Sequence, residues 1–399
     1  MILVKSSALV LLGILLATGT GRAGEWSGHV ALEGRYFFQE GLGPSQHYDS
    51  NLSISAEPEY YHDWDGGRQS LVFKPFVRLD QRDEQRTHWD IRELEWTYAG
   101  SGWETRAGIG RVYWGVTEAW HRVDIINQTD LVENPDREQK LGQPMVKFSS
   151  EKDWGTLDFF LLPGFRERTY AGEDGRIRTH PWVDTDQAEY ESAAGNKRVD
   201  AALRWSHYVG DWDLGMAHFY GTGSDPLLRP GLDDQGRFVL TPFYQVIHQT
   251  SLDLQATIGS WLWKFESLYR DGMEADFYAF TGGLEYTRVG IGGSSGDLGM
   301  LAEVMFDQRR EEATTPFNND IFLALRWAVN DEHSSELLFG VIHDWETHSK
   351  LLNLEASRRL GQNYKLSVQA RAWVDVSPYD LLLPLNRDDY LEINLARYF

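Results

Sequence analysis

The chain has 399 residues, with 38 Lys and Arg against 60 Asp and Glu, a formal net charge of -22, 13% aromatic residues and no Cys. These numbers argue against a disulfide-stapled domain and a thiolate metal site, which both need Cys. They also argue against a nucleic-acid-binding protein, which normally has a basic face, and against a disordered chain, which lacks aromatics.

The first 23 residues have the pattern of a secretory signal. Lys5 supplies a positive start, residues 8–17 form an apolar stretch too short to span a bilayer, and Gly21 and Ala23 place small residues before a cleavage point. The pattern predicts a signal peptide over residues 1–23 and a mature chain that begins at about Gly24. A single membrane anchor is the alternative interpretation. Beyond this segment no apolar run approaches the ~18–20 residues of a membrane-spanning helix.

From Trp26 to Phe399 the sequence alternates with a period of two. In one run, for example, Trp261, Trp263 and Phe265 interleave with Lys264 and Glu266. Because successive residues of a strand point to opposite faces, each such run has one apolar face and one charged face.

The length of these runs favours strands that cross a membrane over the strands of a soluble sandwich. Many runs have about 10–13 residues, whereas globular strands have about 5–6 and a tilted transmembrane strand needs about 9–11. Aromatic residues also gather near the ends of runs, as Trp96 does with Tyr98 and Trp205 with Tyr208. Aromatic girdles at both membrane interfaces are typical of outer-membrane barrels.

The sequence predicts an all-β fold, a transmembrane antiparallel up-and-down β-barrel of about 18 strands, with 16 as the alternative. The predicted strands are 26–39, 50–62, 69–80, 88–99, 102–112, 143–150, 154–163, 197–209, 211–221, 243–257, 260–270, 275–288, 298–308, 320–330, 334–344, 349–360, 363–375 and 388–399.

The connections between these strands alternate between short and long. The long ones, 113–142, 164–196, 222–242, 309–319 and 376–387, all fall on one side, which we interpret as the outer side. An even number of strands then places both chain ends in the periplasm. Residues 24–399 thus form one barrel domain with long outer loops. Pro58 and Pro75 fall inside two predicted strands, where each removes a ladder donor and indicates a bulge.

The last strand ends in an aromatic residue. Leu391, Ile393 and Leu395 alternate up to the terminal Phe399, although Arg397 replaces the apolar residue usual at that place. This end resembles the C-terminal strand of bacterial outer-membrane β-barrels of the porin-like superfamily, and by pattern the resemblance covers the whole mature chain. It implies a bacterial outer-membrane location and an assembly signal at these four residues. It also implies the barrel-assembly machinery, the lipid bilayer and lipopolysaccharide as partners, and leaves a homo-oligomer open.

A barrel of 16–18 strands is wide enough for an aqueous lumen, and the inward faces are predicted to carry both signs of charge. The predicted lumen wall contains Arg35, Lys74, Arg204, Lys264, Glu266, Arg326, Glu355, Arg359 and Lys365. Such a wall would select solutes by charge. The alternative interpretation is that these charges pair with one another and only keep the wall hydrated.

The connection 113–142 is too apolar for a loop in water. Thr117 and Glu118 favour a short helix there, and residues such as Trp114, Trp120 and Ile125 need burial. The segment follows the fifth strand and resembles the constriction loop of general porins, which folds into the lumen. The predicted constriction residues are Asp124, Asp130, Glu133 and Asp136 on the segment, and Arg78, Arg92 and Arg371 on the wall. A lid packed on the outer rim is the alternative.

Three classes of function remain open. The first is a porin-like channel for passive passage of small polar or charged solutes, the second an export or secretion barrel for a polymer, and the third an outer-membrane hydrolase. The letters of a G-x-S-x-G motif occur at 292–296, but that motif needs a strand-to-helix elbow. Four histidines, His207, His218, His248 and His343, are candidates to pair with Ser or Asp. Catalytic residues, a metal site, cofactors and nucleic acid are not expected.

Overall fold

A computed structural model of the chain describes residues 24–272 and 275–399. The predicted signal peptide, residues 1–23, lies outside the described residues. Within the described ranges, no helix has the length and apolar character needed to cross a membrane.

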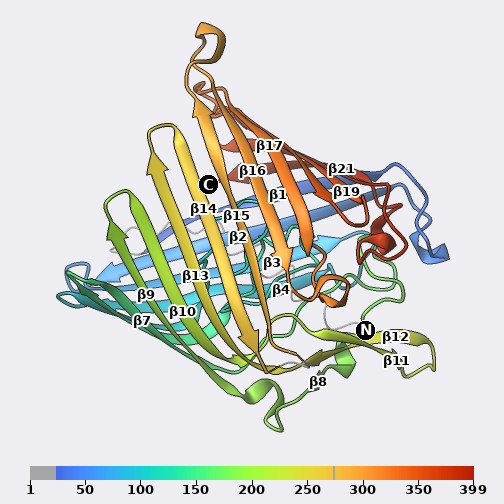
Figure 1. The fold of residues 1–399 in the computed structure, drawn as a ribbon, viewed down its shortest axis with the longest axis horizontal. Coiled ribbons are helices and arrows are strands. Elements are labelled where there is room, and N and C mark those ends of the chain that lie inside the picture. Colours follow the sequence, from blue (N-terminus) through green and yellow to red (C-terminus); the bar gives the residue numbers. More distant parts are fainter. Residues whose placement is uncertain (1–23, 273–274) are drawn as a thin grey trace.

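Eighteen antiparallel strands form one sheet that closes on itself (Figure 1), which confirms the predicted fold class and strand number. Each of these strands pairs with its neighbours along the chain, and the first strand pairs with the last, so the sheet has no free edge. The barrel strands are β1 (Glu25–Phe37), β2 (Ser50–Trp64), β3 (Gln69–Asp80), β4 (His88–Ala99), β5 (Trp103–Gly110), β6 (Gln143–Lys152), β7 (Gly155–Pro163), β9 (Val199–Val209), β10 (Trp212–Thr222), β13 (Val246–Ile258), β14 (Trp261–Asp271), β15 (Phe277–Arg288), β16 (Asp297–Asp307), β17 (Asn319–Ala328), β18 (Glu336–Asp344), β19 (Lys350–Leu360), β20 (Tyr364–Val374) and β21 (Tyr390–Tyr398).

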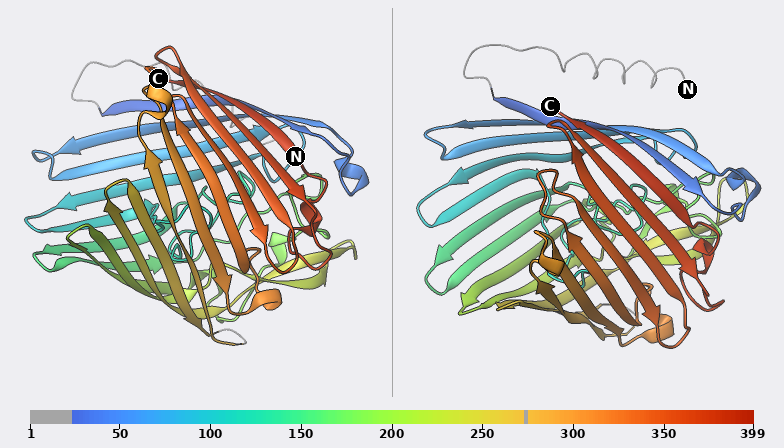
Figure 2. Two further views of the ribbon diagram at one scale, coloured as in Figure 1. Left: turned by 45° about the horizontal axis from the view of Figure 1, so that its top comes forward. Right: turned by 90° about the horizontal axis from the view of Figure 1, so that it is seen from above.

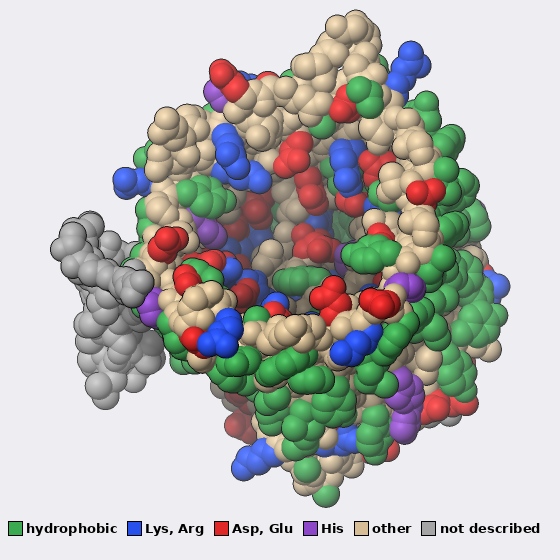
Figure 3. Space-filling model, turned by 90° about the vertical axis from the view of Figure 1, so that its left-hand side faces the viewer, with side chains coloured by type: hydrophobic (Ala, Val, Ile, Leu, Met, Phe, Trp, Pro, Cys, Tyr) green, Lys and Arg blue, Asp and Glu red, His purple; other side chains and the backbone are tan. Residues whose placement is uncertain are grey.

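The period-two pattern of the sequence separates the outer face of the barrel from the inner face. On β17, Leu323, Leu325 and Trp327 are exposed on the outer face, while Phe322 and Ala324, which alternate with them, are buried. Outward apolar side chains suit lipid, and closure pairs every backbone group that water cannot reach there. Figure 3 shows the end of the barrel with the short turns, which is hollowed and lined by charged side chains of both signs.

Aromatic side chains form contacts near both ends of the strands. Near the short turns, Tyr98 stacks on Trp103 with ring centroids 5.3 Å apart, and Trp103 stacks on Phe148 at 6.1 Å. Near the other end, Tyr278 stacks on Phe306 at 5.7 Å. This arrangement matches the two interfacial girdles predicted from the sequence.

The two prolines inside strands act differently. The register between β3 and β4 shifts between Lys74 and Pro75, which is the bulge predicted for Pro75. Pro58 shifts no register: residues 57–59 leave the ladder with β3, and pairing resumes in the same register at Tyr60. Opposite Pro58 lies Gly28, whose φ is +142° and whose Cβ, if it had one, would lie 2.6 Å from the Pro58 Cα. A glycine is therefore needed at this close approach.

All the long connections lie at one end of the barrel (Figures 1 and 2). One of them differs from prediction. The region expected as loop 222–242 contains a hairpin of β11 (Leu227–Leu232) and β12 (Phe238–Tyr244), and β12 also pairs in parallel with β8 (Glu189–Tyr190). These strands are too short to cross a bilayer, so they are not predicted by a length criterion for membrane-spanning strands.

Candidate functional site in the lumen

The connection between β5 and β6, residues 111–142, runs inside the barrel and is held to the wall at several points. The first anchor is Glu266 on β14. Its carboxylate accepts backbone N–H bonds from Val116, Thr117 and Arg122 at 2.6–2.8 Å, and a further bond from the Thr117 hydroxyl at 2.7 Å. A buried carboxylate that gathers several backbone donors fixes the path of the segment that supplies them.

Glu303 on β16 is the second anchor. Its carboxylate accepts the backbone N–H groups of Glu118 and Ala119 at 2.8–3.0 Å. The short helix expected at Thr117 is absent from the described segment, where the chain is irregular. The Thr117 hydroxyl contacts the Glu266 carboxylate at 2.7 Å and the Trp120 carbonyl at 3.1 Å, and the N–H groups of Glu118 and Ala119, which a helix cap would satisfy, bond to Glu303. The prediction of a Thr117 helix cap was wrong.

The apolar residues of the segment pack against apolar residues of the wall. Trp114, Val123, Ile125 and Ile126 form one buried cluster with inward-facing residues of the wall, which are Met145, Phe160, Leu162, Ala202, Ala217, Phe219 and Ile247. Between Trp114 and Val123, Trp120 packs against a second cluster that contains Phe317 and Phe322. This part of the lumen is therefore filled by a packed core, in agreement with the burial expected from the sequence.

Three acidic residues of the segment meet the three arginines predicted on the wall. The Asp130 carboxylate lies 2.6 Å from the guanidinium of Arg92 on β4. The Glu133 carboxylate lies 2.7 Å from that of Arg78 on β3, and the Asp136 carboxylate 3.1 Å from that of Arg371 on β20. These pairs are direct, so the acidic residues are neutralised by the wall and do not stand as a bare ledge across open water.

Asp124 does not meet the wall arginines. Its carboxylate accepts the backbone N–H of Trp114 at 2.7 Å and lies 3.7 Å from the ammonium of Lys140, and both of these groups belong to the same segment. The expectation that Asp124 faces Arg78, Arg92 or Arg371 is thus not met. Asp124 instead closes the segment on itself.

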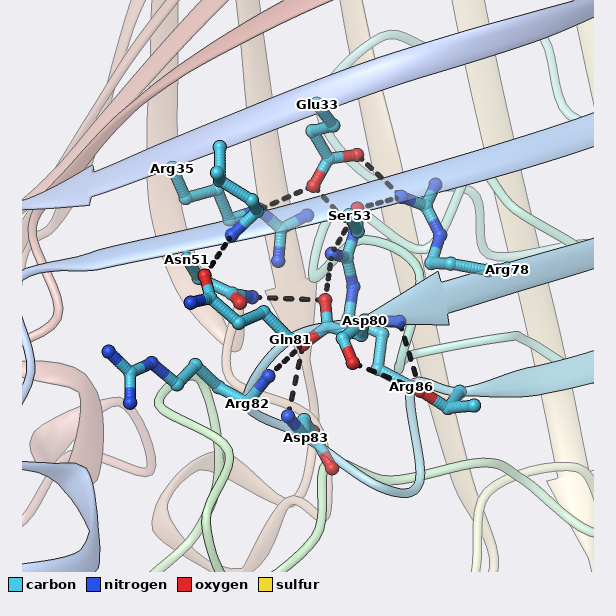
Figure 4. Close-up of polar contacts among 12 residues, drawn as sticks. Glu33, Arg35, Asn51, Ser53, Arg78, Asp80, Gln81, Arg82, Asp83 and Arg86 are labelled. Carbon is cyan, nitrogen blue, oxygen red and sulfur yellow. Dashed lines mark hydrogen bonds and ion pairs between the residues drawn. The ribbon is translucent and has the colours of Figure 1, made fainter. Parts of the chain in front are cut away.

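Around Arg78 the ion pairs extend into a network on the inner face of β1, β2 and β3 (Figure 4). Glu33 on β1 lies 2.9 Å from Arg78, 2.7 Å from Arg86 and 3.2 Å from Arg35. Arg86 also pairs with Asp80 at 2.8 Å, and Arg35 with Glu392 of β21 at 2.6 Å. The network therefore ties the inserted segment to the strands at which the barrel closes.

His88 stands beside two of the segment's carboxylates. Its Nε2 lies 3.6 Å from Asp130 and 3.5 Å from Glu133, which is the spacing of a metal-ligand set. Yet the Arg92 and Arg78 guanidiniums already occupy those two carboxylates. A cation bound there would have to displace two arginines, so the chemistry of this donor set does not favour a metal.

The other residues predicted on the lumen wall lie on its inner face, most of them in ion pairs. Lys74 pairs with Glu59 at 2.7 Å, Arg204 with Asp253 at 2.6 Å and Arg326 with Glu118 at 2.6 Å. Two more of the predicted wall residues have longer ion-pair distances: Lys264 lies 3.7 Å from Glu118, and Glu355 lies 3.7 Å from Arg371. Arg359 and Lys365 face each other in register near the β19–β20 turn, on the side of the sheet that carries Glu355.

A cavity of about 400 Å³ lies between the segment, the wall from β17 to β20 and the long connections. Arginines, carboxylates and many apolar side chains line it, among them Arg137, Arg168, Arg178, Arg371, Glu118, Asp136, Glu138, Glu355, Trp120, Leu228, Phe317 and Leu382. The connection 164–198 contributes two arginines to the lining, Arg168 and Arg178, and Arg168 lies 2.6 Å from Asp225.

The features that suggested a hydrolase are not brought together. In the described part of the chain, none of the four candidate histidines is hydrogen-bonded to a Ser or an Asp; His218 contacts Thr250 at 2.9 Å. Ser294 of the G-x-S-x-G letters lies in a turn, where its hydroxyl donates to the carbonyl of Ile291 at 2.8 Å.

Sequence reasoning placed Glu266 on the wall but missed its role as an anchor, and it missed the roles of Glu303 and Arg86. The sequence holds only a weak indication of these anchors. Each is a carboxylate at an inward position between apolar neighbours, in a barrel that also has a long connection rich in apolar residues. Which backbone donors it would bind depends on the path of the segment, which no spacing in the sequence reports.

Comparison with known proteins supports the fold. No protein-family model and no curated protein matches the chain. Among solved structures, OccK11 (OpdR) of Pseudomonas aeruginosa superposes with a TM-score of 0.53 and 12% identity, over 94% of this chain and 95% of that one. A triple mutant of the Rhodopseudomonas blastica porin gives a TM-score of 0.45 and 10% identity, over 94% of this chain and all of that one. The chain thus has a porin-like β-barrel fold, as the C-terminal pattern implied.

Proposed function

We propose that the chain is a porin-like channel of the bacterial outer membrane, through which small polar or charged solutes diffuse, with segment 113–142 as its constriction. One observation carries the proposal. Inside a closed wall lined by charges of both signs, the segment is bound to β14 and β16 through Glu266 and Glu303, and to β3, β4 and β20 through ion pairs. A segment held in this way narrows the lumen, and its bonds to the wall keep the segment from moving out of the lumen.

The ion pairs also bear on how such a constriction would select solutes. Because Asp130, Glu133 and Asp136 each meet an arginine directly, their charges largely cancel at a distance. We infer that selection depends on the shape left open beside the segment and on those charges that lack a full counter-charge.

The proposal includes the setting of the barrel. The signal peptide is removed before about Gly24, both chain ends lie in the periplasm, and the long connections face outward, where they meet lipopolysaccharide. Ile393, Leu395 and Phe399 are exposed on the lipid side, where the barrel-assembly machinery would read them. The same exposure suits contact with the lipid bilayer, and association into a homo-oligomer stays open.

Planar-bilayer recording of the purified protein tests the proposal. We expect discrete single-channel currents from the native protein, and larger and noisier currents from a Glu266→Ala, Glu303→Ala double variant, because its segment loses the carboxylates that bind its backbone. Glu59→Gln is the matched control: Glu59 pairs with Lys74 on the wall, and its partner is not on the segment.

Absence of current from both native and variant protein would argue against a channel. Equal conductance in native protein and double variant would show that the segment does not limit the current and is no constriction.

A further inference from the structure

A hollow of about 420 Å³ lies on the outer face of the barrel, over the neighbouring strands β10, β13, β14 and β15 (Figure 1). The alternation of these strands turns eight of its lining residues outward, namely Met216, Thr250, Leu252, Phe265, Ser267, Tyr269, Tyr278 and Phe280. We call this hollow the outer groove. Among the described residues it shares none with the lumen cavity, so it is a separate feature on the lipid side of the wall.

The outer groove forms because a small residue stands among large ones. Ser267 of β14 has Leu252 of β13 and Phe280 of β15 as register partners, and its short side chain leaves the space between them open. Aromatic rings stand in a row on one side. Phe265 stacks on Phe280 with ring centroids 6.1 Å apart, and Phe280 stacks on Phe306 at 5.3 Å. The hollow is thus built into the packing of the sheet and does not depend on a loop.

Polar side chains at the outer end of the groove mark the level of the lipid headgroups. His218 and His248 also face outward, with ring centroids 5.8 Å apart, and His218 Nδ1 lies 2.9 Å from the Thr250 hydroxyl. On the next strand the Tyr269 hydroxyl donates to the Asp276 carboxylate at 2.9 Å. Imidazole and carboxylate groups are costly in hydrocarbon, so these residues belong at the polar interface. The groove therefore runs from that interface toward the middle of the strands.

An apolar groove at this depth needs an apolar occupant. Water is absent from the hydrocarbon region, and a void would leave the side chains around it without dispersion contacts on one side. The membrane itself supplies hydrocarbon chains. The groove is continuous with the apolar face that the strands turn to lipid, so such a chain enters it without any opening of the wall.

We propose that the outer groove binds one acyl chain of a membrane lipid as a fixed ligand, with the polar part of the lipid beside His218 and His248. The chain lies over Ser267, between Met216 on one side and the row of rings that begins at Phe265 on the other. The inference goes beyond the proposed channel function and does not depend on it, because the groove and the lumen lie on opposite faces of the wall.

Photo-crosslinking in vesicles tests the proposal, because it separates a bound chain from the general lipid shell. The vesicles contain phosphatidylethanolamine, with a small fraction of the same lipid carrying a diazirine in the middle of one acyl chain. Mass spectrometry of peptides then locates the products. We expect the crosslinks on β13–β15 to exceed those on β17–β20 by about threefold or more, because a chain in the groove gains dispersion contacts. Equal labelling of both sets of strands would mean an unselective lipid shell only, and would overturn the proposal.

Variants locate the site. Ser267→Leu fills the groove and should lower the labelling of β13–β15 to the level of the other strands. Ala372→Leu is the matched control: Ala372 faces outward in the outer half of β20, opposite Leu352, and does not line the groove, so labelling of β13–β15 should not change. Heat-dependent migration in electrophoresis checks folding, and Met216→Trp, which fills the groove from its other side, repeats the test if Ser267→Leu does not fold. Unchanged labelling in a folded groove-filling variant would overturn the assignment.

Native mass spectrometry distinguishes the lipid from a second copy of the chain as the occupant. The protein is released from the same vesicles into detergent and weighed intact. A mass increase of one lipid that Ser267→Leu loses and Ala372→Leu keeps would support the proposal. A dimer that Ser267→Leu dissociates would assign the groove to a second copy, and native protein that retains no lipid would show that the chain is not held. Either result would overturn the proposal and leave the channel function untouched.

Discussion

Two aspartates of the inserted segment show how far the effect of one residue type depends on its surroundings. Asp130 is fully buried between Arg92 at 2.6 Å and the Thr169 hydroxyl at 2.6 Å. Asp124 receives a backbone N–H from Trp114 and has only a distant ammonium as its counter-charge. In the sequence the two are equivalent, because each is an acidic residue in an apolar connection.

We predict that Asp130→Asn destabilises the barrel by about 3 kcal/mol, since it leaves the buried Arg92 with an incomplete counter-charge. Asp124→Asn should cost about 1 kcal/mol or less, because the amide oxygen still accepts the Trp114 N–H. The temperature at which each variant loses its folded position in electrophoresis measures the difference. Similar losses in the two variants would contradict the assigned roles of the two aspartates.

At the scale of residues, the sequence predicted which charges face the lumen better than it predicted their partners. Alternation alone assigns Arg78, Arg92 and Arg371 to the inner face. The pairs that they form require the path of a segment that the alternation does not describe. For the same reason the cluster of Arg35, Arg78 and Arg86 around Glu33 was not foreseen.

At the scale of elements, the inserted segment is held to the wall by a contact whose charge depends on pH, that of His121 with Glu266 and Glu138. The His121 ring lies 3.3 Å from Glu266 on the wall and 3.4 Å from Glu138 on the segment. Burial disfavours the charged ring, but the hydrogen bonds and charges of Glu138 and Glu266 outweigh it and raise the pKa of His121 to about 10. Protonated His121 therefore offsets the repulsion between these two carboxylates.

The direction of the pH effect follows from this raised pKa. The stabilisation that His121 supplies is complete below its ordinary pKa of 6.5 and is lost as the pH rises through about 10. We predict that trypsin cleavage within 113–142 stays slow from neutral pH to about pH 9 and becomes faster above pH 10. His121→Gln should cleave faster at neutral pH and lose most of this pH dependence. A parallel rise in both proteins would assign the effect to other groups, such as Lys140.

The strands that span the membrane were predictable from the sequence because one physical constraint, the thickness of the bilayer, applies to all of them. Eighteen spanning strands must cross the same thickness of lipid, so their length and alternation recur along the whole chain. The β11–β12 hairpin obeys no such constraint, and neither does the irregular path of 113–142. Thr117 shows the limit well: its local pattern favours a helix cap, and a distant carboxylate on β14 overrides it.

At the scale of the whole molecule, the decisive feature is the seam at which β1 meets β21. Nine register pairs from His29–Tyr398 to Phe37–Tyr390 close the barrel, and the Phe399 N–H adds a bond to the Gly28 carbonyl at 3.1 Å. Arg35 and Glu392 reinforce the seam from the lumen side at 2.6 Å. A sandwich of two sheets would have no reason to bring these two ends of the chain together.

The absence of Cys in the native sequence makes this seam directly testable. Leu32 and Leu395 are register partners on the lipid face, and directly opposed residues of antiparallel strands lie about 4.5–5.5 Å apart between Cα atoms, within the range of a disulfide. We predict that a Leu32→Cys, Leu395→Cys protein forms an intramolecular disulfide on oxidation and then unfolds at a higher temperature than its reduced form. The control pairs Leu32→Cys with Leu391→Cys, which is the partner of Tyr36 and so lies four residues out of register. If the control cross-links as readily as the register pair, or if neither does, then the sheet does not close in the way that the whole assignment of wall, lumen and inserted segment requires.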